Sequence, residues 1–159
     1  MKLDPAFYHN LLNSLSQQPH VPIIASGWSH SVALIALMKR LQEEANARHV
    51  FIIERTGKQT ASYGDLGHIG TTDLTALVVG KTLACDALAS LVDSSSFSTA
   101  SIEGKRWGAH FSTLGQNAIL IVIFDYQTNI DRVRMRVRRA TAELNEIMTL
   151  LEQDGVIEN

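Results

Sequence analysis

The sequence has few of the features that mark several protein classes. It contains one cysteine, Cys85, so it cannot form an intramolecular disulfide, and nothing points to an oxidising compartment. No apolar run of signal-peptide length opens the sequence, and none reaches the roughly 18 residues of a membrane-spanning helix. We therefore expect a cytoplasmic protein without stable membrane insertion. We also expect Cys85 to be a buried helical residue that behaves as a small hydrophobe.

Charge is scarce and balanced. Charged residues make up 19% of the 159 residues, and 14 basic against 16 acidic residues leave a net charge of −2. Intrinsic disorder is excluded because 45% of the residues are hydrophobic and the net charge is low. Nucleic acid is disfavoured as a partner because the chain has no global attraction to phosphate. A charge fraction below the usual ~25% indicates that part of the surface does not face water.

Apolar periodicity and turn residues predict one domain with alternating groups of helices and strands. Residues 21–25 contain Pro22 and form at best an edge strand or an extended linker. Consecutive strands with tight turns pair antiparallel, so the fold class is α+β, with helices packed on a sheet. The expected helices span about 4–18, 29–46, 72–92 and 129–151, and the expected strands 50–54, 59–63, 97–102, 107–114 and 118–125.

The most enzyme-like segment is Gly27-Trp28-Ser29-His30-Ser31, which precedes a predicted helix. A nucleophile elbow exposes a serine at such a strand–turn–helix junction. Here Ser31 replaces the final glycine of that motif, and Pro22 interrupts the preceding strand. The simpler interpretation is that Ser29 caps the helix. A small serine hydrolase using Ser29 remains an alternative function.

Metal and phosphate chemistry find little support. The six histidines are scattered, and none stands at i,i+4 with another, so no metal site is predicted. The segment from Gly64 to Gly70 is glycine-rich but lacks the Lys-Ser/Thr pair of a P-loop. A surface connection is the favoured interpretation, and we expect no cofactor.

A basic cluster opens the last predicted helix. Helical spacing puts Arg132, Arg136 and Arg139 on one side and Arg134 and Arg138 on another. These cations oppose the helix dipole, by about 0.3–1 kcal/mol each where exposed. Two interpretations stay open: a solvated face packed by its aliphatic stems, or a surface for an acidic partner or anionic membrane.

The helix predicted at 72–92 carries a different signal. Gly80 lies in its middle, at a cost of about 1 kcal/mol relative to alanine. Ala76, Ala84 and Cys85 keep its neighbourhood small, and small residues let another backbone approach closely. The helix is also apolar on more than one side. We therefore expect it to form a subunit interface.

From about Ser31 to Leu151 the chain resembles a roadblock/LC7 domain. The resemblance rests on order and pattern across five segments rather than on one catalytic motif. It departs from the family at Asp131, where a glycine is common, and in the additional residues up to about His30. The segments are Val50-Phe51-Ile52-Ile53-Glu54-Arg55-Thr56-Gly57-Lys58, Ala61-Ser62-Tyr63-Gly64-Asp65, Leu74-Thr75-Ala76-Leu77-Val78-Val79-Gly80, Ala118-Ile119-Leu120-Ile121-Val122-Ile123-Phe124-Asp125 and Asn129-Ile130-Asp131-Arg132-Val133-Arg134-Met135-Arg136-Val137.

The resemblance implies a five-stranded antiparallel sheet with profilin-like layering. The central helix would cover one face and the first and last helices the other, with an N-terminal helical extension over 1–28, the domain over 29–153 and a tail over 154–159. Family members usually dimerise through their middle strands and central helices. Carried over to this sequence, the interface would include Leu77, Gly80, Lys81, Ala84, Cys85, Leu88, Phe97, Thr99 and Ser101.

The resemblance also implies a non-enzymatic adaptor, with no catalytic residues of its own. Such dimers, formed with themselves or with a paralogue, commonly bind small Ras-like GTPases. Bacterial gliding-polarity relatives stimulate GTP hydrolysis, which links the family to cell polarity and motility. Partner contacts are expected at Asp73, Arg132, Arg136 and Arg139. The alternatives are the hydrolase using Ser29 and a ligand- or membrane-sensing module using the face from Arg132 to Arg139.

Overall fold

The computed structural model describes residues 28–65, 71–92 and 98–153. The predicted first helix, the segment 21–25, the tail 154–159 and Phe97 lie outside these residues. Within them the order of elements agrees with the prediction. The elements are α2 (Trp28–Ala45), β1 (His49–Glu54), β2 (Gln59–Gly64), α3 (Thr71–Leu91), β3 (Thr99–Glu103), β4 (Trp107–Leu114), β5 (Ala118–Asp125) and α4 (Ile130–Gln153).

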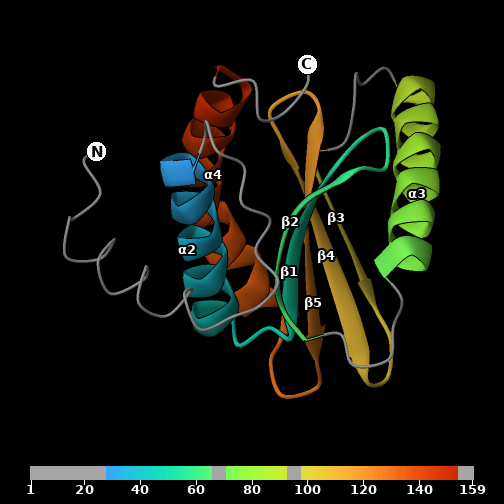
Figure 1. Ribbon diagram of the computed structural model, residues 1–159. Helices are drawn as coiled ribbons and strands as arrows, with labels where there is room; N and C mark the ends of the chain where they lie inside the picture. The colour runs from blue at the N-terminus through green and yellow to red at the C-terminus, as the bar shows by residue number, and fades with distance from the viewer. Residues whose placement is uncertain (1–27, 66–70, 93–97, 154–159) are drawn as a thin grey trace.

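The five strands form one sheet in the order β2-β1-β5-β4-β3, and every neighbouring pair is antiparallel (Figure 1). This confirms the predicted α+β class and the five-stranded antiparallel sheet. All eight residues of β5 are buried, because the strand is central and both of its faces are covered. At the two edges lie β2 and β3.

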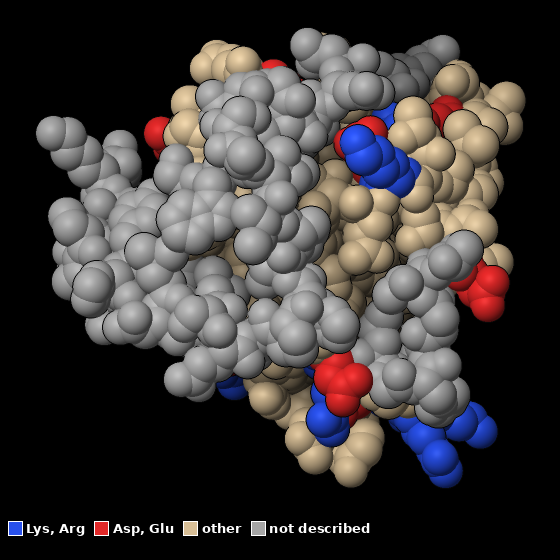
Figure 2. All heavy atoms as spheres, in the orientation of Figure 1, with Lys and Arg blue, Asp and Glu red and all other residues tan. Residues whose placement is uncertain are grey.

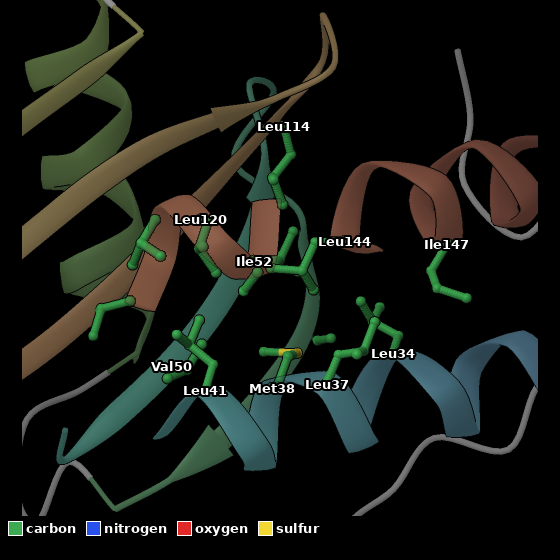
Figure 3. Close-up of a cluster of buried hydrophobic side chains, with 14 of the residues drawn as sticks. Leu34, Leu37, Met38, Leu41, Val50, Ile52, Leu114, Leu120, Leu144 and Ile147 are labelled. Atoms are coloured by element: carbon green, nitrogen blue, oxygen red, sulfur yellow. The ribbon is translucent and has the colours of Figure 1, made fainter. Parts of the chain in front are cut away.

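Helices α2 and α4 cover one face of the sheet, and α3 covers the other (Figure 1). The main core lies between the helix pair and the sheet, where Leu37 and Met38 of α2 meet Leu144 of α4 and Ile52 of β1 (Figure 3). The predicted apolar stripe of α4 is buried in this core, as its spacing requires. The stripe consists of Val133, Val137, Ala140, Leu144, Ile147 and Leu151.

The core beneath α3 is smaller. Val78 is the α3 residue in its fully buried part, where it meets the rings and branched side chains of β1, β4 and β5. Two further contacts hold α3 in place. The ammonium of Lys81 lies 3.9 Å from the centroid of the Phe111 ring, and Arg55 Nη1 lies 2.7 Å from Asp86 Oδ2. The buried strand residues are Phe51, Ile53, Phe111, Ile119, Ile121 and Ile123.

Two positive φ angles shape the lower end of the sheet in Figure 1. Asn46 follows the last residue of α2 with a φ of 52°, the left-handed conformation that commonly ends a helix. Gly64 ends β2 with a φ of 116°. A Cβ at Gly64 would lie 2.3 Å from the Arg48 carbonyl oxygen, so only glycine fits without displacement of the backbone.

Candidate functional site

The strongest candidate site is an exposed apolar stripe along α3. Its large members are exposed in the protomer, Leu77 by 72%, Leu88 by 54% and Leu91 by 82%. Gly80 and Ala84 lie between them, so the five positions follow steps of three, four, four and three residues. In this view the surface over α3 is mostly uncharged (Figure 2). The stripe therefore offers apolar side chains around a small-residue centre.

The stripe lies on the flank of α3 that faces β3. Lys81 is next to the stripe on the helix and reaches Phe111 of β4, the neighbour of β3. Asp86, on the other flank, pairs with Arg55 beside the β1–β2 turn. A Cβ built on Gly80 meets nothing within 4 Å. The protomer therefore leaves this glycine open, and packing within the protomer does not account for its small size.

Cys85 is half-buried, so the prediction that it is buried was wrong. Cys85 lies on the same face of α3 as the buried Val78 and Ala89, but it borders a small cavity with Lys81 and Phe111, so its side chain stays partly accessible. The sequence pattern could not show this, because a helix that is apolar on several sides gives no direction for its buried face.

Within the described part of the chain, β3 has no strand on its outer edge, and this free edge lies beside the stripe. The Thr113 N–H donates to the Ser98 carbonyl at 2.9 Å, and the Gly104 N–H donates to the Trp107 carbonyl at 2.7 Å. Ser98 and Gly104 therefore direct their backbone polar groups toward β4, and alternate residues between them do the same. The backbone groups directed at the open edge belong to Thr99, Ser101 and Glu103.

Two apolar residues extend this surface and were not predicted. Ile102 is 55% exposed and Trp107 is 47% exposed. Ile102 follows Ala100 by two residues and Trp107 precedes Ala109 by two. Both alanines pack against the core beneath α3, so Ile102 and Trp107 lie on the α3 face of the sheet. Strand alternation could have placed them on that face. Their exposure could not have been deduced, because it depends on how far α3 extends over the β3–β4 hairpin.

Among the described residues, α3 is the one helix long and apolar enough to cross a membrane by length and composition. Lys81 and Asp86 lie within that segment, and each contacts the sheet side of the protein. A charged group at the centre of a membrane helix costs about 2.5–3.5 kcal/mol on insertion scales. The apolar surface of α3 therefore suits a protein contact better than a bilayer.

The arginine cluster divides between two flanks of α4. Arg132 Nε donates to the Glu44 carbonyl at 2.9 Å, and Arg136 Nη1 lies 3.6 Å from Glu44 Oε2, so both tie α4 to the end of α2. Arg139 and Glu143 stand four residues apart on α4, but they form no ion pair with each other. Glu143 Oε1 instead accepts from Arg40 of α2 at 2.8 Å, because the seam between the two helices brings that guanidinium closer.

The structure separates the predicted partner-binding residues. Asp73 is exposed in the first turn of α3. Arg132, Arg136 and Arg139 lie on α4, across the sheet, so one protomer does not bring all four together. Of the three arginines, Arg139 is exposed and belongs to none of the α2–α4 ion pairs described above.

A buried histidine on β4 was not predicted. His110 Nδ1 lies 2.7 Å from Ser101 Oγ of β3. Burial, followed by the positive charges of Arg134 and Lys81, lowers the pKa of His110 to about 4 from its ordinary value of 6.5. The imidazole is therefore neutral at pH 7 and a weak base, so the pair does not provide a good general base for catalysis.

A polar cavity of about 420 Å³ opens at the end of the sheet where α2 ends. Arg48 Nε donates to Asp125 Oδ2 at 2.5 Å within it. The Gln127 N–H and the Arg48 guanidinium hold the pKa of Asp125 below its ordinary value, although burial opposes this shift. Two charged side chains of the cavity, Arg48 and Asp125, are thus already paired with each other. The described residues include no group of three or more His, Cys, Asp or Glu side chains that could hold a metal ion.

Ser29 lies in the first turn of α2, which begins at Trp28, one residue before the predicted cap. Helix bounds commonly shift by a residue or two, so the helix start agrees with the prediction. The side chain of Ser29 and the predicted strand before it lie outside the described part of the chain. The hydrolase alternative therefore gains nothing from the structure.

Solved structures share this fold. MglB of Myxococcus xanthus is 33% identical to the chain, with a TM-score of 0.71 over 75% of this chain and 97% of that one. The gliding protein MglB from Thermus thermophilus is 24% identical, with a TM-score of 0.71 over 82% and 96%. A roadblock/LC7 domain from Streptomyces avermitilis is 16% identical, with a TM-score of 0.62 over 71% and 95%. No family model and no curated protein matches the sequence.

Proposed function

The chain belongs to the roadblock/LC7 family, and from that premise we propose that it is a non-enzymatic, homodimeric regulator of a small Ras-like GTPase. The observation that carries the proposal is the exposed stripe of α3 beside the free edge of β3. The likeness to MglB, one example of which is described as a gliding protein, supports a role in cell polarity and motility.

The proposed dimer joins two copies about a twofold axis. The edge strands β3 pair antiparallel, so that the open backbone groups of Thr99, Ser101 and Glu103 bond to their counterparts. The two α3 helices pack side by side through Leu77, Gly80, Ala84 and Leu88, with Lys81 and Cys85 at the margin of the contact. An isologous contact of this kind uses the same patch on both subunits.

The physical reason for the dimer is the cost of leaving the stripe in water. Burial of a leucine side chain contributes about 1.5–3 kcal/mol, and the stripe contains three exposed leucines per copy. A glycine at the centre lets the two helix backbones approach. Ile102 and Trp107 enlarge the apolar surface at one end of the stripe, where the partner's α3 would end.

The proposed mechanism is conformational. A preformed surface that binds one nucleotide state of the GTPase more tightly shifts the population of that state. Asp73, Arg132, Arg136 and Arg139 are the proposed contacts. Arg139 is the sharpest test, because Arg132 and Arg136 also hold the end of α2 and their replacement would disturb the fold.

Two measurements test this function. Light scattering over a micromolar concentration series should give the mass of a dimer, and a strict monomer would contradict the dimer. Calorimetric titration with a Ras-like GTPase from the same organism, loaded with GDP or with a non-hydrolysable GTP analogue, should show at least a tenfold preference for one state.

The contact residues need a matched pair of variants. Arg139→Glu should weaken GTPase binding at least fivefold, whereas Arg138→Glu, an identical charge change at the next position, should leave it within twofold. Equal affinity for both nucleotide states would contradict regulation. Equal effects of the two variants would remove Arg139 from the proposed contact.

A further inference from the structure

A polar step runs between α4 and the edge of the sheet, on the face opposite α3. Its floor consists of Thr99 and Ser101 of β3 with His110 and Ser112 of β4, and its wall carries Arg134 and Arg138 of α4. We call these six residues the polar shelf. Thr99 pairs with Ser112 and Ser101 with His110 in register, and paired residues point to the same face. His110 pairs with Val122 of the main core, which fixes that face as the one covered by α4.

Arg134 and Arg138 are on the flank of α4 that faces this floor. They share a flank of the helix with Asn145, about two and three turns further along, whose Oδ1 accepts from the Gly115 N–H at the β4–β5 turn. Arg134 is also close enough to lower the pKa of His110. Both arginines are exposed, and among the described residues Arg134 pairs with Asp131 of the same helix, at a long 3.6 Å.

The β3 half of the floor is accessible and carries hydroxyl groups. Thr99 is exposed and Ser101 is half-buried, whereas His110 and Ser112 in the β4 half are buried. The hydroxyl groups can donate, and both guanidinium groups carry fixed positive charge. Burial lowers the pKa of His110 most, and the positive charges of Arg134 and Lys81 lower it further, so the histidine stays neutral here. An anionic ligand would relieve that positive potential, so charge complementarity favours carboxylates.

In the proposed dimer, β3 pairs with its counterpart, and the two shelves become one continuous groove. We propose that this groove binds an extended acidic peptide segment of a partner protein, with its carboxylates on Arg134 and Arg138 of both copies. This inference rests on the proposed dimer for the joined groove and on the protomer alone for each shelf. It uses the flank of α4 opposite to Arg139, and so differs from the proposed GTPase contact.

A peptide fits this groove better than a membrane does. A helix with its side chains is about 10–12 Å across, so beside α4 the floor lies at the bottom of a step and, in the dimer, between two helical walls. A bilayer surface is too flat to reach hydroxyl groups at that depth. An extended chain can follow such a groove, and eight residues at about 3.3 Å each extend over roughly 26 Å.

The probe for the test is a fluorescein-labelled peptide of eight glutamates, followed by fluorescence anisotropy with the full chain. We expect saturable binding with one peptide per two chains. A peptide of eight glutamines and vesicles of mixed phosphatidylglycerol and phosphatidylcholine should not bind. The proposal would be overturned if the glutamine peptide binds, or if the protein binds the vesicles but does not bind the acidic peptide.

The same matched variants then locate the site. Arg138→Glu should weaken binding of the acidic peptide at least fivefold, and the double variant Arg134→Glu/Arg138→Glu should weaken it more than tenfold. Arg139→Glu should leave the affinity for the peptide within twofold of the wild type. An equal loss from Arg138→Glu and Arg139→Glu would refute the shelf, because it would mean general attraction to a basic helix. Circular dichroism of each variant checks that α4 is intact.

The outcomes separate this proposal from the proposed function. If light scattering gives a monomer and the acidic peptide binds one per chain with the same dependence on Arg138, the shelf holds and the joined groove is refuted. If the protein is a dimer that binds its GTPase but not the acidic peptide, the proposed function stands and the shelf is refuted.

Discussion

Replacement of Gly80 by leucine should change the stability of the protomer and the affinity of the dimer in opposite directions. In the protomer, a Cβ at this position meets nothing within 4 Å, so the new side chain finds open space. A helix-interior glycine costs about 0.8–1.0 kcal/mol relative to alanine, and leucine is nearly as favourable as alanine. The Gly80→Leu protomer should therefore be more stable than the wild-type protomer by roughly 0.8 kcal/mol.

The dimer should respond in the opposite direction. Leucine at the centre of the contact holds the two α3 helices apart, and overpacking of this kind costs about 1–3 kcal/mol per site. The twofold axis brings two such sites together, so the loss is roughly 2–6 kcal/mol. Each 1.4 kcal/mol is a tenfold change in affinity, so the dimer dissociation constant should rise by about 30-fold to more than 10⁴-fold.

Sedimentation velocity over a concentration series, with urea unfolding of the same samples, measures both effects. Gly80→Ala gives the same gain in helix propensity with one methyl group and should weaken the dimer less. Ser90→Leu adds an exposed leucine on the other flank of α3 and should leave the dimer unchanged. An unaltered dissociation constant in Gly80→Leu would refute the packing of α3 against its counterpart. A parallel loss in Ser90→Leu would show that the effect is not local to the stripe.

Three further changes test the architecture. The pKa of His110 is lowered to about 4, so the stability that its neutral form contributes above pH 6.5 should be lost as the pH falls toward 4. Urea unfolding at pH 4.5 and 7 should show a smaller loss in His110→Gln than in the wild type. Identical pH profiles would contradict the burial of a neutral imidazole. Glu143→Gln should destabilise by about 0.5–1 kcal/mol in the same assay, since it weakens the half-buried pair with Arg40, and Arg40→Gln serves as the partner variant, which should add little to it. Gly64→Ala should cost roughly 2–5 kcal/mol, because φ is +116° and the new Cβ would press on the Arg48 carbonyl; a loss below about 1 kcal/mol would show that the turn gives way.

The parts of the fold that could be predicted are those encoded by local period. The stripe of α4 repeats for six positions, and the run from Ala118 to Phe124 is apolar throughout, so each predicts its element and its burial. The resemblance to a known family supplied the layers. Fold class and order therefore followed from the sequence, and the structure confirmed them.

The parts that could not be predicted depend on contacts between distant segments. Nothing local links Arg40 to Glu143 or Arg132 to the carbonyl of Glu44, because these pairs exist only once α2 and α4 lie antiparallel. The Ser101–His110 pair likewise requires the register of β3 against β4. Helical spacing predicted that the arginines lie on two sides of α4. Which side faces α2 and which faces the sheet could be seen only in the folded structure.

The unequal burial of the two sheet faces has a consequence for motion. Helix α3 is held by few buried side chains, whereas α2 and α4 share the main core. Segments with little buried apolar contact open locally at a lower free energy than the whole domain unfolds. Amide hydrogens of α3 should thus exchange faster than those of α4. A ligand that binds only while α3 is packed on the sheet should slow this exchange as the ligand concentration rises. Association would then determine how often α3 opens and exposes its hydrogen bonds to water.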